Sequence, residues 1–483
     1  MKHASIPNVP TQLFLGGEWC DASDGGAFDV DNPATGEIIA RVASATVADG
    51  MTALDAAEKA FPGWAARKPR ERGEVLRKAF ELIIARQEEL ARLITMENGK
   101  ALPDSRGEVA YAAEFFRWSS EEAVRAIGDL YRGPSTGARI VVGHKPAGIA
   151  ILVTPWNFPA AMATRKIGPA LAAGCPVILK PASATPLTML ALMPILEQAG
   201  VPKGIISVLP SAQTGKLVDA LLHDPRVRVV SFTGSTEVGR KLLHAAADSV
   251  LNPEMELGGN APFVVLEDAD IDEAVDGAIV AKMRNIGEAC TAANRFYVHN
   301  RVHDAFARKL ADRIGAMKIG NGLEEGVEIG SLVNAETRDK VVELVADAVK
   351  RGAKVLTGGS IRNGPGYFYQ PTVMVDVPDD ARCFREEIFG PVAALARFSD
   401  EEDCIQRCND TEYGLVAYVY TRDLKRGMAF SEQLDFGMIG LNRGLVSDPA
   451  APFGGMKQSG IGREGAHHGI MEFLETQYIS TEW

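Results

Sequence analysis

Short apolar runs alternate with helical segments from Gly148 onward, and this pattern constrains the fold more than any other feature. Runs rich in β-branched residues predict strands at Ile149–Val153, Pro176–Leu179, Ile205–Leu209, Val227–Phe232 and Pro262–Leu266. Helices are predicted between them, at Pro159–Ala173, Pro186–Ala199, Thr214–His223 and Thr236–Ala247. Alternation of this length is typical of parallel βαβ units and predicts a doubly wound α/β sheet.

The remaining segments extend this α/β unit on both sides. Apolar residues at three- and four-residue steps predict one long helix from Arg70 to Glu97. A second alternating stretch from about Ile271 to Gly440 predicts another domain, because 483 residues exceed the usual size of one hydrophobic core. Ala138–His144 is predicted to be a short strand, and the tail Thr476–Trp483 to be extended and exposed.

Charge and composition disfavour several classes of protein. A net charge of −12 argues against a nucleic-acid partner, which requires a cationic footprint. The most apolar stretch, Gly148–Thr164, contains two prolines and an asparagine and cannot span a membrane. The N-terminal segment has no apolar signal-peptide core, and the six cysteines have neither disulfide-framework nor zinc-finger spacing. We therefore expect a cytoplasmic protein without a metal site, in which Cys404 and Cys408 are core residues of one helix face.

Polar residues follow the predicted strands, where doubly wound sheets bind ligands. The first strand ends in a turn from Thr154 to Pro159, in which Asn157 is either a turn residue or a donor to a developing oxyanion. The next strand ends in Lys180, either an exposed charge or a ligand for a ribose or phosphate. Ser183 occupies a position where a carboxylate would repel a 2′-phosphate by roughly 4 kcal/mol, so a dinucleotide with that phosphate fits.

Three further segments carry candidate chemistry. Gly234 and Ser235 precede a predicted helix, and a helix N-terminus binds phosphate groups, although the segment lacks the lysine of a P-loop. Glu256 lies among glycines and is either a solvated loop residue or a general base. Cys290 follows a glycine-punctuated segment and is either a packing residue or a nucleophile.

Taken together and in this order, these motifs resemble the aldehyde dehydrogenase superfamily over essentially the whole chain. The matching segments are Pro155–Pro159, Lys180-Pro181, Phe232–Ser235, Glu256–Asn260, Gly287–Cys290, Glu386–Pro391 and Pro452–Gly460. The resemblance implies an aldehyde dehydrogenase-like fold with a Rossmann-type cofactor domain, an α/β catalytic domain and a small β oligomerisation element. The expected limits are 1–127 and 147–257, then 258–460, and finally 128–146 and 461–483.

The resemblance also assigns roles to individual residues. Cys290 matches the nucleophile, Glu256 the general base, and Asn157 the oxyanion donor, while Lys166 and Glu464 match a proposed proton relay. The positions expected to hold the dinucleotide are Thr154, Pro155, Trp156, Asn157, Lys180, Ala182, Ser183, Gly234, Ser235, Leu257, Glu387 and Phe389. NADP is the favoured cofactor and NAD is also compatible.

These roles define a reaction. The thiolate adds to an aldehyde carbon, hydride leaves to the nicotinamide, and water activated by Glu256 releases the acid from a thioester. Relatives that pass the acyl group to coenzyme A generally lack that base, so hydrolysis is expected here.

Within the superfamily, Ala161–Lys166, Arg284-Asn285 and Lys457–Gly465 are most similar to succinate-semialdehyde dehydrogenases. There, the positions of Arg165, Arg284 and Ser447 bind the remote carboxylate, as paired guanidiniums can. The alternative is that either arginine forms an ion pair with a nearby glutamate and does not bind substrate. Other substrates in view are glutarate semialdehyde or a broad range of aldehydes, and a non-catalytic NAD(P)-binding structural protein is the alternative of another class.

Two departures from the family pattern stand beside the nucleophile. Many members have glutamine where this chain has Glu288, whose carboxylate either raises the thiol pKa or points away. Ala292 replaces a second cysteine found in some relatives, so no disulfide switch forms there. The extended segments Ala138–His144 and Thr476–Trp483 resemble the family's oligomerisation strands and predict a homodimer or homotetramer.

Overall fold

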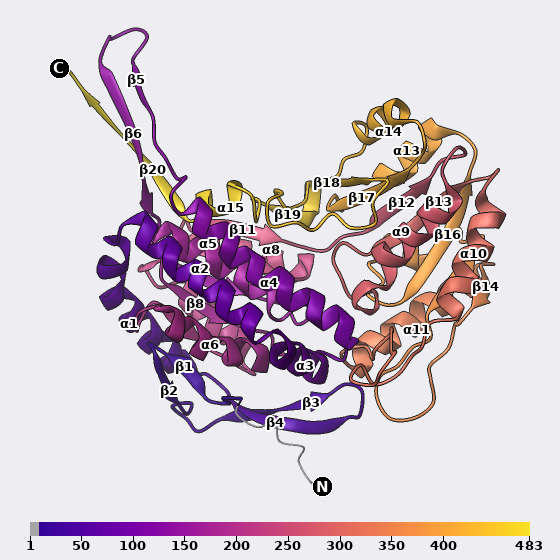
Figure 1. Ribbon diagram of the computed structural model, residues 1–483, viewed down its shortest axis with the longest axis horizontal. Coiled ribbons are helices and arrows are strands. Elements are labelled where there is room, and N and C mark those ends of the chain that lie inside the picture. The colour runs from indigo at the N-terminus through magenta and orange to yellow at the C-terminus, as the bar shows by residue number, and fades with distance from the viewer. Residues whose placement is uncertain (1–8) are drawn as a thin grey trace.

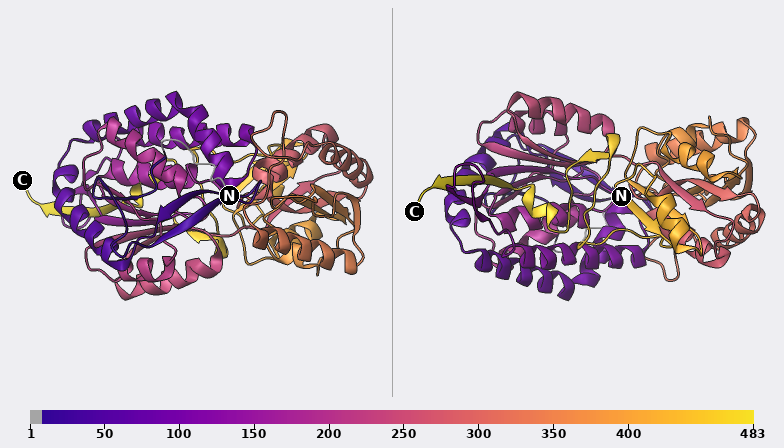
Figure 2. Two further views of the ribbon diagram at one scale, coloured as in Figure 1. Left: turned by 90° about the horizontal axis from the view of Figure 1, so that it is seen from below. Right: turned by 90° about the horizontal axis from the view of Figure 1, so that it is seen from above.

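The structure is a computed structural model that describes residues 9–483, and it contains two α/β lobes side by side with a projecting sheet (Figures 1 and 2). Residues 1–8, on which the expectation of a leaderless chain partly rests, lie outside the described part. The predicted fold class is confirmed. No helix within residues 9–483 combines the length and apolarity needed to cross a bilayer.

The first lobe is built on an eight-stranded sheet in the order β19-β11-β10-β7-β8-β9-β1-β2. Its five central strands are parallel: β7 (Ile149–Val153), β8 (Val177–Lys180), β9 (Ile206–Val208), β10 (Val227–Thr233) and β11 (Asn252–Glu256). The antiparallel edges are β1 (Leu13–Leu15), β2 (Glu18–Cys20) and β19 (Gly460–Ile461). Strand β19 arrives from the far end of the chain and pairs Ile461 with Met255 and Gly460 with Glu256.

Helices cover both faces of this sheet (Figure 2). One face carries α2 (Pro69–Ala85), α3 (Gln87–Asn98), α4 (Leu102–Glu122), α5 (Ala161–Ala173) and α6 (Leu187–Ala199). The other carries α1 (Val47–Ala65), α7 (Thr214–Leu222) and α8 (Thr236–Asp248). Gly174 and Gly200 end α5 and α6 in the left-handed conformation that glycine adopts readily.

One prediction for the first lobe is wrong. The single helix expected from Arg70 to Glu97 is two helices, because Arg86 leaves helical geometry at φ −112° and ψ 19°. The apolar spacing continues across this break, so periodicity cannot detect it. The segment that ends at Glu256, for which no element was predicted, is strand β11.

The second lobe has a seven-stranded sheet in the order β14-β15-β16-β13-β12-β17-β18. Its strands are β12 (Ala261–Val265), β13 (Ala293–His299), β14 (Lys354–Thr357), β15 (Thr372–Val375), β16 (Val392–Phe398), β17 (Val416–Tyr420) and β18 (Met438–Leu441). Its helices are α9 (Ile271–Met283), η1 (Arg284–Gly287), α10 (His303–Gly315), α11 (Ala335–Lys350), α12 (Arg382–Arg385), α13 (Glu401–Asn409) and α14 (Leu424–Ser431). The predicted strand at Pro262–Leu266 belongs to this sheet, not to the first. Cys404 and Cys408 are buried on α13, as expected.

The projecting sheet consists of β5 (Leu130–Arg132), β6 (Arg139–Pro146) and β20 (Leu474–Thr481), which extend away from both lobes (Figure 1). A two-stranded sheet joins β3 (Ala27–Asn32) to β4 (Glu37–Ala43), and η2 (Lys457–Ser459) and α15 (His468–Met471) lie near the C-terminus. The sheets change over between β11 and β12, and the domain limits drawn from the sequence stay a prediction.

Candidate active site

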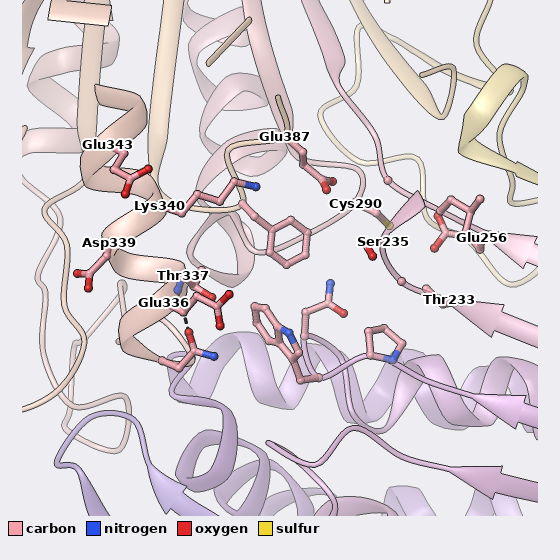
Figure 3. A pocket seen from close by; sticks show the side chains of 18 residues that line it. Thr233, Ser235, Glu256, Cys290, Glu336, Thr337, Asp339, Lys340, Glu343 and Glu387 are labelled. Atoms are coloured by element: carbon pink, nitrogen blue, oxygen red, sulfur yellow. Dashed lines mark hydrogen bonds between the residues drawn. The ribbon is translucent and has the colours of Figure 1, made fainter. Parts of the chain in front are cut away.

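A cavity of about 770 Å³ lies where the carboxyl ends of the first sheet meet the second lobe (Figure 3). Ten of the predicted site residues line it: Pro155, Trp156, Asn157, Gly234, Ser235, Glu256, Leu257, Cys290, Glu387 and Phe389. They come from the ends of β7, β10 and β11 and from two loops of the second lobe. The fold therefore brings together residues that are more than 200 positions apart in sequence.

Cys290 lies at the end of a strained backbone segment. Asn285, Ile286 and Gly287 have successive positive φ values of 56°, 62° and 75°. Two non-glycine residues in this region cost conformational energy, and such strain is concentrated at functional sites. A Cβ on Gly287 would lie 2.3 Å from the Gly390 carbonyl oxygen, so glycine is required for the close approach. This geometry presents the half-buried Cys290 to the cavity.

Glu256 ends strand β11 and points into the same cavity. It is 2% exposed, and neither carboxylate oxygen has a hydrogen-bond partner within residues 9–483. Burial raises the pKa of the Glu256 carboxyl to about 8, and the nearby Arg165 guanidinium opposes that rise. An unpaired carboxyl that titrates near neutral pH suits proton transfer to or from water.

The thiol of Cys290 shares this environment. Burial raises its pKa well above the usual range, the Glu256 carboxylate raises it further, and Arg165 opposes both effects. The nucleophile is therefore a thiol at neutral pH until a base takes its proton, and Glu256 is the base at hand.

Asn157 lies in the turn after β7 and contacts the loop that carries Cys290. Its side-chain Nδ2 donates to the Glu288 carbonyl oxygen at 3.0 Å, which leaves one amide hydrogen for another acceptor. Its Oδ1 is buried without a partner in the described structure. The site thus combines a thiol, a base and an amide donor, which is the set required for addition to a carbonyl.

Of the residues expected to hold a dinucleotide, Gly234, Ser235 and Leu257 line the cavity with those of the β7 turn and the Glu387 loop, whereas Thr154, Lys180, Ala182 and Ser183 do not. Ser235 caps α8, because its hydroxyl accepts from the Val238 N–H at 3.4 Å, and the N-terminus of α8 opens on the cavity. A Cβ on Gly234 would lie 2.5 Å from the Phe232 ring, so a side chain at this position would collide with that ring. Lys180 is 5% exposed with no ion-pair partner in the described chain, and burial lowers its pKa to about 8. Ser183 donates to the Ser211 carbonyl oxygen at 2.8 Å. Its hydroxyl carries no negative charge that would repel a 2′-phosphate.

At the nucleophile end of the cavity, Trp156 and Phe389 contact each other edge to face, with ring centres 5.4 Å apart. Phe389 has a φ of 55°, a second strained position in the site. Glu387 accepts from the Gly259 N–H at 3.2 Å, and burial raises its pKa to about 7. In Figure 3, Lys340 directs its amine toward this carboxylate. The predicted residues Thr154 and Ala182 lie at the adjoining ends of β7 and β8.

The two predicted relay residues are in contact. Lys166 Nζ donates to Glu464 Oε1 and to the Ser231 hydroxyl, both at 2.7 Å, and all three side chains are buried. Arg165 forms an ion pair with the other oxygen of Glu464 and lies 4.0 Å above the Phe453 ring. The glutamate partner considered as an alternative for Arg165 is therefore present.

Arg284 is less engaged than Arg165. Its guanidinium lies 5.2 Å from the Phe158 ring and makes one long hydrogen bond, 3.4 Å, to the Thr291 hydroxyl. No carboxylate within residues 9–483 forms an ion pair with it. Ser447 is half-buried in the loop after β18. Arg284 is thus the guanidinium with capacity left for an incoming carboxylate.

Glu288 points away from the nucleophile. Its side chain is fully buried, and Oε1 accepts from the Val333 N–H at 3.0 Å. Burial raises the pKa of this carboxyl well above its usual range, which favours its protonated form.

One wall of the cavity was not foreseen. Helix α11 of the second lobe and the residue that caps it contribute Asn334, Glu336, Thr337, Asp339, Lys340 and Glu343. These residues lie on the polar face of an ordinary amphipathic helix, and only the capping signal of Asn334, which accepts from the Thr337 N–H at 2.8 Å, was visible in the sequence.

Comparison with known proteins identifies the family of this chain. Residues 19–479 match the family described as "Aldehyde dehydrogenase family". The chain is 49% identical over 468 residues to glutarate-semialdehyde dehydrogenase of Pseudomonas putida, with 97% of each chain covered. It is 47% identical over 468 residues to the NADP(+) succinate-semialdehyde dehydrogenase GabD of Escherichia coli, again with 97% of each covered. A crystal structure of succinate-semialdehyde dehydrogenase from Burkholderia pseudomallei superposes with a TM-score of 0.96 at 46% identity, covering 98% of both chains.

Proposed function

The chain belongs to the aldehyde dehydrogenase family of NAD(P)-dependent oxidoreductases, and from this premise we propose that it oxidises succinate semialdehyde to succinate. The observation that carries the substrate assignment is Arg284, a half-buried guanidinium near Cys290 with no carboxylate partner in the described chain. A guanidinium binds a carboxylate through two parallel hydrogen bonds, which a neutral aldehyde cannot offer. NADP is the favoured acceptor, supported by Lys180, by Ser183 and by the name of the Escherichia coli relative.

The chain's own residues form and release the acyl group. Glu256 takes the proton of Cys290, and the sulfur adds to the aldehyde carbon to give a thiohemiacetal. The free amide hydrogen of Asn157 is available to the oxygen that becomes negative, a contribution worth about 3 kcal/mol in comparable sites. The nicotinamide supplies two-electron oxidation by accepting hydride when it is bound.

Release of the acid uses the same base. Glu256 is buried and has no hydrogen-bond partner among the described residues. It removes a proton from a water molecule that attacks the acyl carbon on Cys290. Lys166 and Glu464 lie in one buried network with Arg165 and provide a route for the proton away from Glu256. The positive charge of Arg165 favours the ionised form of Glu256 and so opposes the larger rise in its pKa that burial causes.

A second candidate substrate is glutarate semialdehyde, favoured by the Pseudomonas putida relative. The deciding experiment compares kcat/KM for succinate semialdehyde, glutarate semialdehyde and propanal, each with NAD and with NADP. We expect succinate semialdehyde with NADP to give the highest value. A higher value with glutarate semialdehyde would move the assignment to the longer acid, and equal values for all three would contradict a carboxylate site.

The chain also has the features of a subunit. The projecting sheet exposes apolar side chains on β5 and β20, including Leu130, Tyr131, Tyr478 and Ile479. Exposed edge strands of this kind pair with another chain. We therefore propose a homodimer or homotetramer, and a cytoplasmic location stays a prediction from the sequence.

A further inference from the structure

We propose that Lys100 and Glu108 are positioning residues that hold the Asn157 turn against the nucleophile loop. Neither residue lines the cavity or belongs to the set expected from the sequence. The proposal rests on the cysteine chemistry described above and is independent of which aldehyde is the substrate.

Lys100 and Glu108 form an ion pair that is closed to solvent. The Nζ of Lys100 lies 2.6 Å from Oε2 of Glu108, and both side chains are 0% exposed. Lys100 also lies 4.3 Å from the centre of the Phe158 ring. Removing two charges from water costs more than a similar apolar pair would, so net stability is a weak reason for this pair. A role in fixing one local geometry is the better explanation.

The ion pair forms hydrogen bonds with the backbone at both ends of the Asn157 turn. Lys100 Nζ donates to the backbone carbonyl oxygen of Asn157 at 2.6 Å. The other oxygen of Glu108 accepts from the N–H groups of Ala160 and Ala161, at 2.8 and 3.3 Å, where α5 begins. The pair therefore spans the turn from the residue that carries the amide to the helix that follows.

The same carbonyl oxygen links the turn to the nucleophile loop. Asn285 Nδ2 donates to the Asn157 carbonyl oxygen at 3.0 Å and to the Glu288 carbonyl oxygen at 2.8 Å. The Asn157 side chain donates to that same Glu288 oxygen. Because Lys100 contributes a charged donor, it is the strongest of the contacts that set where the Asn157 amide lies relative to Cys290.

The backbone around Lys100 is anchored in the second lobe. Gly99 has a φ of 94°, and a Cβ there would lie 2.5 Å from the Ser331 hydroxyl. The Ser331 N–H donates to the Gly99 carbonyl oxygen at 3.1 Å, and the Leu102 N–H donates to the Gly322 carbonyl oxygen at 3.0 Å. Lys100 thus connects the backbone of the second lobe to the Asn157 turn of the first lobe.

The test replaces the ion pair by neutral residues of similar size. Lys100→Met alone leaves Glu108 buried and unpaired, so the informative variant is Lys100→Met with Glu108→Gln. A displacement of about 1 Å costs up to about 100-fold in rate, and we expect kcat and kcat/KM to fall together by 10- to 100-fold. A fall in kcat/KM caused only by a higher KM would contradict the proposal.

A double-mutant cycle separates positioning from general destabilisation. If Lys100 and Glu108 act through the Asn157 amide, the same pair of changes in an Asn157→Ala background costs less than about twofold. Full, additive losses in that background would overturn the proposal. The cycle is measured on whichever aldehyde the parent oxidises fastest, so a wrong substrate assignment does not affect it.

Glu97 provides a matched control. It is a buried glutamate that accepts from the N–H groups of Leu187 and Thr188, at 2.8 and 2.9 Å, where α6 begins, and it has no hydrogen bond to the Asn157 turn. Glu97→Gln is expected to lower Tm while kcat stays within about twofold of the parent. Alkylation of Cys290 by iodoacetamide is expected to keep its rate in the Lys100/Glu108 variant. A kcat loss with Glu97→Gln as large as with that variant, or a changed alkylation rate, would assign the pair to structure alone.

Discussion

Burial of Glu256 sets the pH at which catalysis begins. Its pKa is raised to about 8, so the carboxyl is protonated and inactive as a base below that pH and becomes competent above it. We expect log kcat/KM to rise with a slope of about one per pH unit up to pH 8 and then to level off. A pH–rate profile checks this limb. In Glu256→Gln the limb should disappear together with most of the activity, and an unchanged profile would assign the base elsewhere.

Substitutions of Arg284 and of Arg165 are expected to have different kinetic effects, although both residues are arginines near the nucleophile. Arg284→Ala removes a guanidinium that has no carboxylate partner among the described residues, so KM for succinate semialdehyde should rise about 10- to 100-fold, as loss of a charge-assisted hydrogen bond implies. KM for propanal should change less than about threefold. Steady-state kinetics on both aldehydes measure the difference, and equal effects would contradict a carboxylate role for Arg284.

Arg165 has a carboxylate partner of its own. Arg165→Ala leaves Glu464 buried beside Glu256 without its guanidinium, so two like charges then share one dry region. We expect kcat to fall about tenfold or more for succinate semialdehyde and propanal alike, with the limb of the pH profile moved upward. A selective effect on succinate semialdehyde would instead give Arg165 the substrate role expected from the resemblance.

Glu288 makes stability depend on pH. Because the pKa of Glu288 is raised in the folded state, the folded protein binds this proton more tightly than the unfolded chain does. The resulting stabilisation is complete below the unfolded pKa near 4.5. That effect is lost as pH rises toward the folded pKa, at about 1.4 kcal/mol per pH unit. Tm of Glu288→Gln should therefore match the parent near pH 4.5 and exceed it by a growing margin as the pH rises above that value. A constant difference in Tm would show that Glu288 is ionised in the folded protein.

Among single residues, sequence reasoning located those with unusual chemistry. Cys290, Glu256 and Asn157 were candidates as reactive or polar residues, but their local patterns left a structural explanation open, and the resemblance to the family supplied their roles. The direction of the Glu288 side chain was not predictable, since it depends on a contact with Val333, which is 45 residues away. Lys100 and Glu108 are only eight residues apart, but their role depends on contacts with the Asn157 turn, which no local charge pattern reveals.

At the scale of elements, the backbone of η1 limits which residues the site tolerates. Gly287→Ala places a side chain at a φ of 75° and against the Gly390 carbonyl, beside Phe389. We expect kcat/KM to fall about 10- to 100-fold and Tm to drop. Gly107 is the matched control, because it lies inside α4 with open space around its Cα, and Gly107→Ala should raise Tm slightly. Normal kinetics in Gly287→Ala would show that the loop adapts.

Elements with regular apolar patterns were predictable, and the exceptions have physical reasons. Strand β11 reads Asn-Pro-Glu-Met-Glu, which is short and has no β-branched residue. Its two carboxylates, Glu254 and Glu256, are buried and face the buried network and the cavity, so polar side chains occupy positions where a buried strand usually has apolar ones. The break at Arg86 leaves the spacing of apolar residues intact, so the two helices look like one.

For the whole molecule, the projecting sheet predicts the state of assembly. Tyr478 is 67% exposed and Ile479 is 59% exposed on the edge strand β20, where an isolated chain would leave them in water. Light scattering should therefore give at least twice the mass of one chain. Tyr478→Asp with Ile479→Asp should shift the mass toward one chain, while Leu356→Asp on the edge strand β14 should not. A parent protein that is monomeric at micromolar concentration would contradict the subunit interface.

The order of the two lobes was predictable from the alternation of strands and helices, and the resemblance placed their junction between residues 257 and 258, but the strand pattern alone did not locate it. The expected strand at Pro262–Leu266 exists and joins the other sheet, since Glu256 to Asn260 carries the chain across. Nothing in a local pattern specifies which sheet a parallel strand enters. Only the pairing partners of the finished fold decide that.

Strand β19 has a consequence for how the protein is made. The strand that carries Glu256 is complete only when Gly460 and Ile461 pair with it, although some 200 residues separate them. During translation the outer edge of β11 therefore stays unpaired until residues 460 and 461 have been synthesised. We expect a chain truncated before Gly460 to leave the backbone of Glu256 without this neighbour and so to lose activity.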